Sequence, residues 1–290
     1  MTLPDEVRAA CAELAGRARS VRIDVSALQT LDPGPEPELD HERHFLDGPP
    51  ADVADYFLAL DTINFGSGWF PTLHKRPDTS GYFTVAGALA DRFRAAGPWS
   101  GDSLRAMRTE EVADTLGQAR DHELMALYAQ ALRQLGAFLG DRRALDLAAE
   151  ARGSAAALAA ALAAGMALYD DRGFYKRAQI APSNLALAGV ADFDDLDRLT
   201  IFADNLVPHV LRTDGVLVYA DGLAALIDAG RLLRFGPQER EIRACAVHAC
   251  ELLSAQLGLA PRAIDHRLWT RGQDPVYKAH PRHRCRCVYY

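Results

Sequence analysis

Three short segments hold the side chains best suited to chemistry. The range 174–179 reads Phe-Tyr-Lys-Arg-Ala-Gln, so two adjacent cations, Lys176 and Arg177, stand beside two aromatic rings. The ranges 201–204 (Ile-Phe-Ala-Asp) and 219–221 (Tyr-Ala-Asp) each place a carboxylate after an aromatic residue. A fixed cation suits a phosphomonoester, a ring can stack on a flat ligand, and a carboxylate can pair with a cation. The combination predicts a site for a small ligand that is phosphorylated, aromatic and positively charged.

Each segment also has an ordinary structural interpretation. Lys176 and Arg177 also fit a pair of solvated surface charges, since such side chains are seldom buried. Phe202 with Asp204 also fits a core ring beside a helix-capping carboxylate, and Asp221 fits a cap for the helix that follows it. From these residues alone, both interpretations stand.

The composition is that of an ordinary globular enzyme. Of 290 residues, 49% are hydrophobic and 24% are charged, which supports a sizeable core. The formal net charge of -7 argues against direct nucleic-acid binding, because affinity for a polyanion depends on neutralising many phosphates. The longest apolar run, 154–168, is mostly alanine and falls short of the ~20 strongly apolar residues of a membrane span. We expect a small-molecule partner and no membrane, and the oligomeric state is left undetermined.

The cysteines indicate a compartment. There are five, an odd number for a set of disulfides, and no secretory segment precedes them. A reducing cytoplasm is therefore the expected location.

Two further segments complete a recognisable set. Asp-Thr-Ile-Asn-Phe at 61–65 and His-Arg-Cys-Arg-Cys-Val-Tyr-Tyr at 283–290 join the segments above. Together they closely resemble the queuosine salvage proteins, which are queuosine 5'-phosphate N-glycosylases. Lys-Arg-Ala-Gln, Phe-Ala-Asp and the terminal Tyr-Tyr are specific in combination, and the resemblance spans nearly the whole chain.

This resemblance implies a fold and a reaction. The fold would be helical and similar to that of DNA glycosylases. The reaction would be hydrolysis of the N-glycosidic bond of queuosine 5'-phosphate, giving queuine and ribose 5-phosphate for queuine salvage. Two other classes stay open: a helical protein that binds a modified base without cleaving it, and a DNA-repair glycosylase, against which the acidic balance argues.

The resemblance also implies catalytic residues. Asp265 lies in Ile-Asp-His-Arg-Leu-Trp at 264–269, which is similar to a family stretch whose Asp lies at the catalytic centre. His266 and Arg267 replace two tyrosines of that stretch, so this chain lacks those two rings. Asp204 is expected to be the second catalytic carboxylate, and either Asp204 or Asp221 would pair with the cationic side arm of queuine or with the base edge. The competing interpretation of Asp265 is a helix cap after Pro261.

The resemblance also implies a set of substrate-binding residues, which are His44, Lys176, Arg177, Phe202, Ala203, Asp221, His266 and Trp269. Phe202 would stack on the base, and Lys176 and Arg177 would hold the phosphate or ribose. His41 competes with His44 for the base contact. Asp61 and Asn64, four residues apart on one helical face, fit either ligand binding or an internal polar network.

The C-terminal segment raises a metal hypothesis. His280, His283, Cys285 and Cys287 carry side chains that bind zinc, but their spacing is not a standard zinc pattern. Because the resembling family ends in a similar segment without needing a metal, we prefer a docked terminal strand that closes the site. No metal and no cofactor are expected.

Periodicity predicts the elements that position these residues. Helices are expected at 3–18, 51–64, 85–96, 102–107, 109–118, 120–139, 143–166, 194–202, 205–212, 221–229, 237–257 and 261–269. A short extended piece is expected at 21–25, a hairpin at 69–84, and a Pro-rich loop carrying His41 and His44 at 30–50. The fold class is therefore mainly α with a small β element. We expect one compact domain over 1–290, in which 1–100 packs on a helical body at 101–290.

Overall fold

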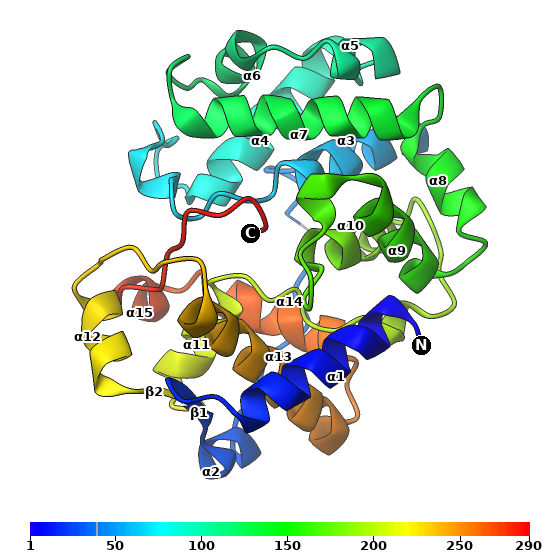
Figure 1. The fold of residues 1–290 in the computed structure, drawn as a ribbon. Coiled ribbons are helices and arrows are strands. Elements are labelled where there is room, and N and C mark those ends of the chain that lie inside the picture. The colour runs from blue at the N-terminus through cyan, green and yellow to red at the C-terminus, as the bar shows by residue number, and fades with distance from the viewer. Residues whose placement is uncertain (39) are drawn as a thin grey trace.

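The computed structural model describes residues 1–38 and 40–290, and it is mainly α-helical, which confirms the predicted fold class (Figure 1). Its α-helices are α1 (Leu3–Gly16), α2 (Val25–Gln29), α3 (Pro50–Thr62), α4 (Gly81–Ala96), α5 (Gly101–Arg105), α6 (Thr109–Leu116), α7 (Glu123–Leu139), α8 (Ala144–Glu150), α9 (Ala155–Gly165), α10 (Lys176–Leu187), α11 (Val207–Thr213), α12 (Asp221–Asp228), α13 (Pro237–Leu257), α14 (Pro261–Arg271) and α15 (Pro275–Lys278). The described strands are β1 (Val21–Ile23) and β2 (Leu217–Tyr219), which pair antiparallel.

The helices surround two main hydrophobic clusters. The first is built on α3, α4, α7 and α10 and includes Phe57, Leu89 and Tyr128. The second is built on α1, α11, α13 and α14 and includes Val210 and Ile264. In Figure 1 these helix groups lie above and below one another, and the C-terminal segment runs between them. This arrangement leaves a boundary between two packed bodies, where clefts commonly form.

The sequence pattern accounts for the packing of the N-terminal helix α1 against α13. Val7 and Cys11 recur at helical spacing, and both are buried where α1 packs against α13. The expected extended piece is confirmed as β1, whose Val21 is paired with Tyr219.

Three predicted elements are wrong. The hairpin at 69–84 is instead a 3-10 turn, Phe70–Thr72, followed by the start of α4, because Pro71 favours a helical turn and the Ser80 hydroxyl accepts from the amide of Phe83. The helix at 143–166 is broken into α8 and α9 at Arg152 and Gly153, which both have positive φ. The helix at 194–202 is reduced to a 3-10 turn, Leu196–Arg198, because the Asp195 carboxylate is held by the first residues of α9.

In the described part of the chain, no single helix is both long and apolar enough to span a membrane. Helices α8 and α9 would pass that test only as a pair, and they are bent by 118°.

Candidate active site

One cavity collects most of the predicted residues. It lies at the boundary of the two bodies and is lined by α3, α4, α10 and α14, by the segment 202–206 and by the C-terminal segment. Of the predicted site residues, it brings together His44, Lys176, Phe202, Asp204, Asp265, His266 and Trp269. Arg177, Ala203 and Asp221 do not line it.

Asp265 is a buried carboxylate in the second turn of α14. Because α14 begins at Pro261 and its N-cap is Ala260, the alternative that Asp265 caps the helix is wrong. Its Oδ1 accepts a hydrogen bond of 2.8 Å from the amide of Phe202. Burial, with a smaller contribution from the charge of Asp204, raises the pKa of Asp265 to about 7. A carboxylate held at neutral pKa inside a cavity is typical of catalytic acids and bases.

Asp204 supports the start of a helix and also lines the cavity. Its Oδ1 accepts from the amides of Leu206 and Val207 at 2.7 and 3.4 Å, so it supports the start of α11. It also lines the cavity and is only partly buried. The negative charge of Asp204 adds to the effect of burial in raising the pKa of Asp265.

Lys176 and Arg177 point in different directions, because consecutive helical residues are about 100° apart around the axis. Lys176 Nζ donates to the carbonyl of Asn64 at 3.0 Å, and burial lowers the pKa of Lys176 to about 8, against the attraction of Asp204 and Asp61. Arg177 is also buried, so the interpretation of the two residues as a solvated surface pair is wrong.

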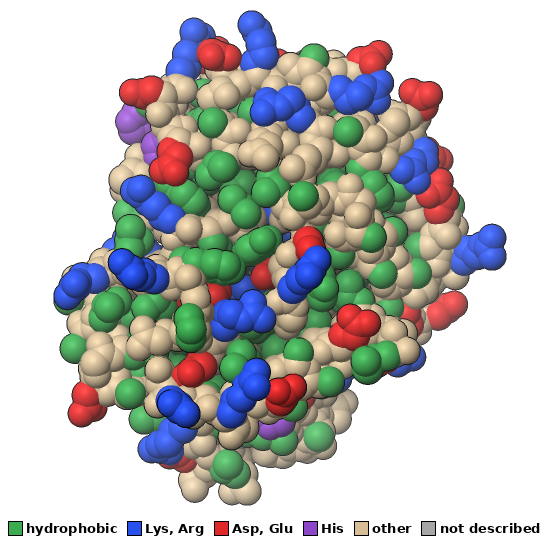
Figure 2. Space-filling view, in the orientation of Figure 1, with side chains coloured by type: hydrophobic (Ala, Val, Ile, Leu, Met, Phe, Trp, Pro, Cys, Tyr) green, Lys and Arg blue, Asp and Glu red, His purple; other side chains and the backbone are tan. Residues whose placement is uncertain are grey.

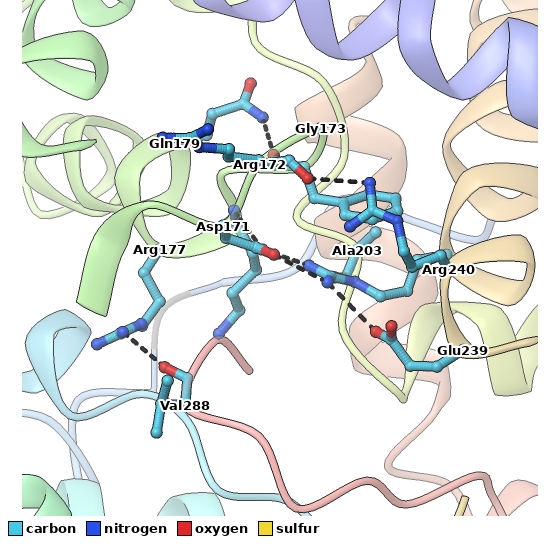
Figure 3. A network of polar contacts seen from close by, with 12 residues as sticks. Asp171, Arg172, Gly173, Arg177, Gln179, Ala203, Glu239, Arg240 and Val288 are labelled. Carbon is cyan, nitrogen blue, oxygen red and sulfur yellow. Dashed lines mark hydrogen bonds and ion pairs between the residues drawn. The ribbon is translucent and has the colours of Figure 1, made fainter. Parts of the chain in front are cut away.

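The guanidinium of Arg177 is hydrogen-bonded to three backbone carbonyls. It donates to the carbonyl of Val288 at 2.7 Å (Figure 3). It also donates to the carbonyls of Thr62 and Leu168 and lies over the rings of Phe65 and Tyr169. Arg177 therefore fixes the C-terminal segment and the end of α3 rather than facing the cavity.

Asp61 belongs to an internal network. It is fully buried, and its Oδ1 accepts from Asn184 Nδ2 at 2.8 Å. Burial raises the pKa of Asp61 to about 7, opposed first by the charge of Lys176. Asn64 and Asn184 line the cavity, and Lys176 donates to the Asn64 carbonyl, so this network connects to the site.

Aromatic rings form one wall of the cavity. Trp269 contacts Tyr82 and Phe83 edge-on at centroid distances of 5.5 and 5.6 Å. His44 is held by the Asp40 carbonyl at 2.9 Å and the Tyr82 hydroxyl at 3.0 Å. Tyr82 and Phe83 were missed because they fall in the range predicted as a hairpin.

His266 also lines the cavity, and the centroid of its ring lies 6.0 Å from that of Phe202. Burial, reinforced by the charge of Arg262, lowers the pKa of His266 to about 4. The imidazole is therefore neutral near pH 7 and can offer a hydrogen bond without adding a charge.

The remaining predicted residues lie elsewhere. Ala203 is buried, and its carbonyl accepts from Arg243 Nε at 2.8 Å. Asp221 is exposed at the first position of α12, whose N-cap is Ala220, and it makes no capping hydrogen bond.

A buried ion network supports the segment that carries Phe202 and Asp204. Arg243 on α13 forms ion pairs with Asp171 at 2.5 Å and with Glu239 at 3.3 Å. Its Nε also donates to the carbonyl of Ala203, and Figure 3 labels these three partners. The sequence offers one signal for it, the spacing of Glu239 and Arg243 by one helical turn, but that pattern usually marks a surface pair.

The C-terminal segment docks without forming a strand. The carbonyl of Tyr290 accepts from the amides of Gly66 and Ser67 at 2.9 and 3.4 Å. The backbone of Cys285 passes so close to Gly68 that a Cβ there would lie 2.5 Å from the Cys285 carbonyl oxygen. An isolated bridge between Leu233 and Cys285 is the only strand-like pairing of this segment in residues 1–38 and 40–290. The prediction of a docked strand is therefore wrong in its secondary structure, although Tyr290 does line the cavity.

Comparison with known proteins adds the following. Residues 44–290 match the family model described as "Queuosine salvage protein". The chain is 33% identical over 279 residues to the queuosine 5'-phosphate N-glycosylase/hydrolase of Sphaerobacter thermophilus, covering 88% of this chain and 86% of that protein. It is 26% identical over 301 residues to the protein of the same name from Nematostella vectensis, covering 87% and 85%. The Mus musculus protein of that name is 35% identical over 136 residues, covering 40% of each.

Proposed function

The chain belongs to the queuosine salvage protein family, and from this premise we propose that it hydrolyses the N-glycosidic bond of queuosine 5'-phosphate to queuine and ribose 5-phosphate. The observation that carries the proposal is the cavity itself, in which a buried carboxylate, a second carboxylate and a buried lysine meet an aromatic wall. These are the groups that a flat, cationic and phosphorylated ligand requires.

The substrate explains why a carboxylate must act on the sugar side. A 7-deazapurine carries carbon where a purine has N7, so the usual protonation site that helps the base leave is missing. A carboxylate near C1' can stabilise an oxocarbenium-like transition state, activate water or attack directly, as in glycoside hydrolysis. We assign this role to Asp265, whose Oδ1 is fixed by the Phe202 amide.

The second carboxylate has a partner in the substrate. The side arm of queuine carries a secondary amine that is cationic at neutral pH. We assign Asp204 as its partner, because Asp221 lies outside the cavity. Burial is the main cause of the raised pKa of Asp265, and a cation against Asp204 would remove the smaller contribution that the charge of Asp204 makes. Substrate binding would thereby favour the ionised form of Asp265, which a developing positive charge at C1' needs.

The aromatic residues would position the base. Phe202, His266 and Trp269 offer rings on its two sides, and each stacking contact contributes ~1–3 kcal/mol by analogy with bases on single strands. His44 would meet a base edge, since its ring is already oriented by Asp40 and Tyr82.

Two cations, Lys176 and Arg282, line the cavity, and we assign Lys176 to the phosphate and ribose. Its pKa of about 8 keeps it mostly cationic at pH 7. Arg177 has the role of holding Lys176 and the C-terminal segment in place, since its guanidinium is taken up by three carbonyls. We further infer a reducing compartment such as the cytoplasm, because all five cysteines are buried free thiols.

The direct test is to incubate purified protein with queuosine 5'-phosphate and to measure free queuine by mass spectrometry. We expect queuine and ribose 5-phosphate in equal amounts. The Asp221→Asn variant is the matched control, because it removes an exposed carboxylate outside the cavity, and it should retain full activity. Nucleotide retained by the protein without release of queuine would contradict hydrolysis and favour a binding protein.

A further inference from the structure

A second hollow adjoins the proposed active site. It is lined by the range 67–81 on one side and by 278–284 on the other. Ser67, Phe70, Ser80 and Arg282 line both this hollow and the catalytic cavity. The two spaces therefore adjoin at these residues, and we call the second one the basic groove.

The basic groove concentrates positive charge on an acidic protein. Lys75, Lys278, Arg282 and Arg284 line it, against one carboxylate, that of Asp78. Within residues 1–38 and 40–290, none of these four cations forms an ion pair. In Figure 2, several Lys and Arg side chains lie on the left flank of the molecule, and others are spread over the rest of the visible face. Unpaired cations that share a groove attract an anion.

The choice of lysine at this place is informative. The chain contains three lysines and 29 arginines. Lys176 lines the catalytic cavity, and Lys75 and Lys278 line the basic groove, so all three lysines lie at these two adjoining spaces. A lysine ammonium is a compact charge with three rotatable donors, which suits a phosphate whose oxygens change orientation.

Two polar side chains without partners in the described part of the chain, Ser67 and Arg282, lie where the cavity and the groove adjoin. Ser67 is buried, and its Oγ has no hydrogen-bond partner among the described residues. Arg282 lies at the same junction, and its guanidinium forms no hydrogen bond or ion pair in residues 1–38 and 40–290. A free hydroxyl and a free guanidinium beside one opening can together donate to the oxygens of one phosphate.

We propose that the basic groove binds a second phosphate attached to the 5'-phosphate of the substrate, so that the enzyme also cleaves the nucleoside 5'-diphosphate. Ser67 and Arg282 meet the first phosphate at the junction, and Lys75 and Lys278 meet the second. The bond cleaved is the same: water adds a proton to the base and hydroxide to C1', releasing queuine and ribose 5-diphosphate. This inference rests on the proposed function, because the ligand is placed by its nucleoside end in the catalytic cavity.

The test compares two substrates on two double variants. Lys75→Ala/Lys278→Ala removes two exposed cations of the groove, and Arg19→Ala/Arg108→Ala removes two exposed, unpaired cations outside both spaces. We expect the groove variant to lower kcat/KM for queuosine 5'-diphosphate roughly threefold to tenfold and to leave the 5'-monophosphate within about twofold, as for two exposed charge contacts. The control variant should change neither substrate. Equal losses for both substrates, or no loss for either, would overturn the proposal.

A binding measurement separates this inference from the proposed function. Inorganic pyrophosphate is titrated into wild type and into both double variants by calorimetry at low salt. Weaker binding to the groove variant alone supports the proposal, and equal binding to all three proteins refutes it. This outcome does not depend on turnover. Failure of the proposed function appears separately, as wild type that releases no queuine from the 5'-monophosphate.

Discussion

Replacing Asp265 by Asn tests both the catalytic role of this carboxylate and the energetic consequence of burying it. The amide keeps an oxygen that can accept the 2.8 Å hydrogen bond from Phe202, so the local structure should persist. What is lost is the negative charge that we propose acts beside C1'. Removing one such electrostatic group lowers kcat by roughly 10²- to 10³-fold, or about 2.7–4 kcal/mol. We therefore expect queuosine 5'-phosphate to be bound but turned over at least 100-fold more slowly.

The same substitution should stabilise the protein above neutral pH. The pKa of Asp265 is raised from 3.8 to about 7 by burial, so ionised Asp265 opposes folding. This difference corresponds to at most about 4 kcal/mol, at 1.36 kcal/mol for each tenfold change in proton affinity. The folded state binds the proton more tightly than the unfolded state, so the destabilisation is absent below pH 4, grows between pH 4 and 7, and is constant above pH 7.

Urea denaturation at pH 4.5 and pH 8, combined with mass-spectrometric assay of queuine, measures both effects. The free energy of unfolding of Asp265→Asn should exceed that of wild type by about 1 kcal/mol at pH 4.5 and by up to about 4 kcal/mol at pH 8. Asp221→Asn, at an exposed carboxylate, should change neither stability nor turnover. Unchanged turnover in Asp265→Asn would refute the catalytic assignment, and an equal stability difference at the two pH values would refute the account of its burial.

Three further predictions follow from the same geometry. Lys176→Ala should lower kcat/KM for queuosine 5'-phosphate far more than for the free nucleoside, and equal losses in the two assays would contradict its phosphate role. The pH profile of kcat/KM should be bell-shaped, rising through about 7 as Asp265 ionises and falling above about 8 as Lys176 loses its proton, so a rate that is flat from pH 6 to 9 would exclude both assignments. Arg243→Met should destabilise the protein by about 3–5 kcal/mol in urea denaturation, because it leaves Asp171 and Glu239 buried without their cation, and a loss below about 1 kcal/mol would show that those carboxyls are solvated or protonated.

The sequence predicted the elements better than the connections between them. Helical spacing located α1, α3, α7 and α13 because their apolar faces repeat over several turns. The hairpin expected at 69–84 failed because closely spaced aromatic residues and prolines fit several local structures, and the choice was made by the cap at Ser80. Short segments without a repeating face depend on tertiary contacts that periodicity does not contain.

The site shows the same division. The resemblance identified His44, Phe202, Asp204 and Asp265 as members of one site, and the structure places all four around one cavity. The link between Asp265 and the Phe202 amide joins residues 63 positions apart, so no local pattern could reveal it. Adjacent cations were predicted to act together at 176 and 177, yet the helix turns them apart, and α10 directs only the first toward the cavity.

The unfavourable charges in the cavity would each have a partner in a substrate that carries a cation at one end and a phosphate at the other. Without ligand, Asp204 and Asp265 repel each other while burial disfavours the charge of Lys176. A cationic side arm against Asp204 and a phosphate near Lys176 would relieve both strains at once, and each would favour the ionised state that catalysis needs. A nucleoside without the side-arm amine would leave Asp265 about half protonated at pH 7, because its pKa would stay at about 7. Selectivity for the modified base would therefore be expressed in the protonation state of the catalytic carboxyl as well as in the fit of the ring.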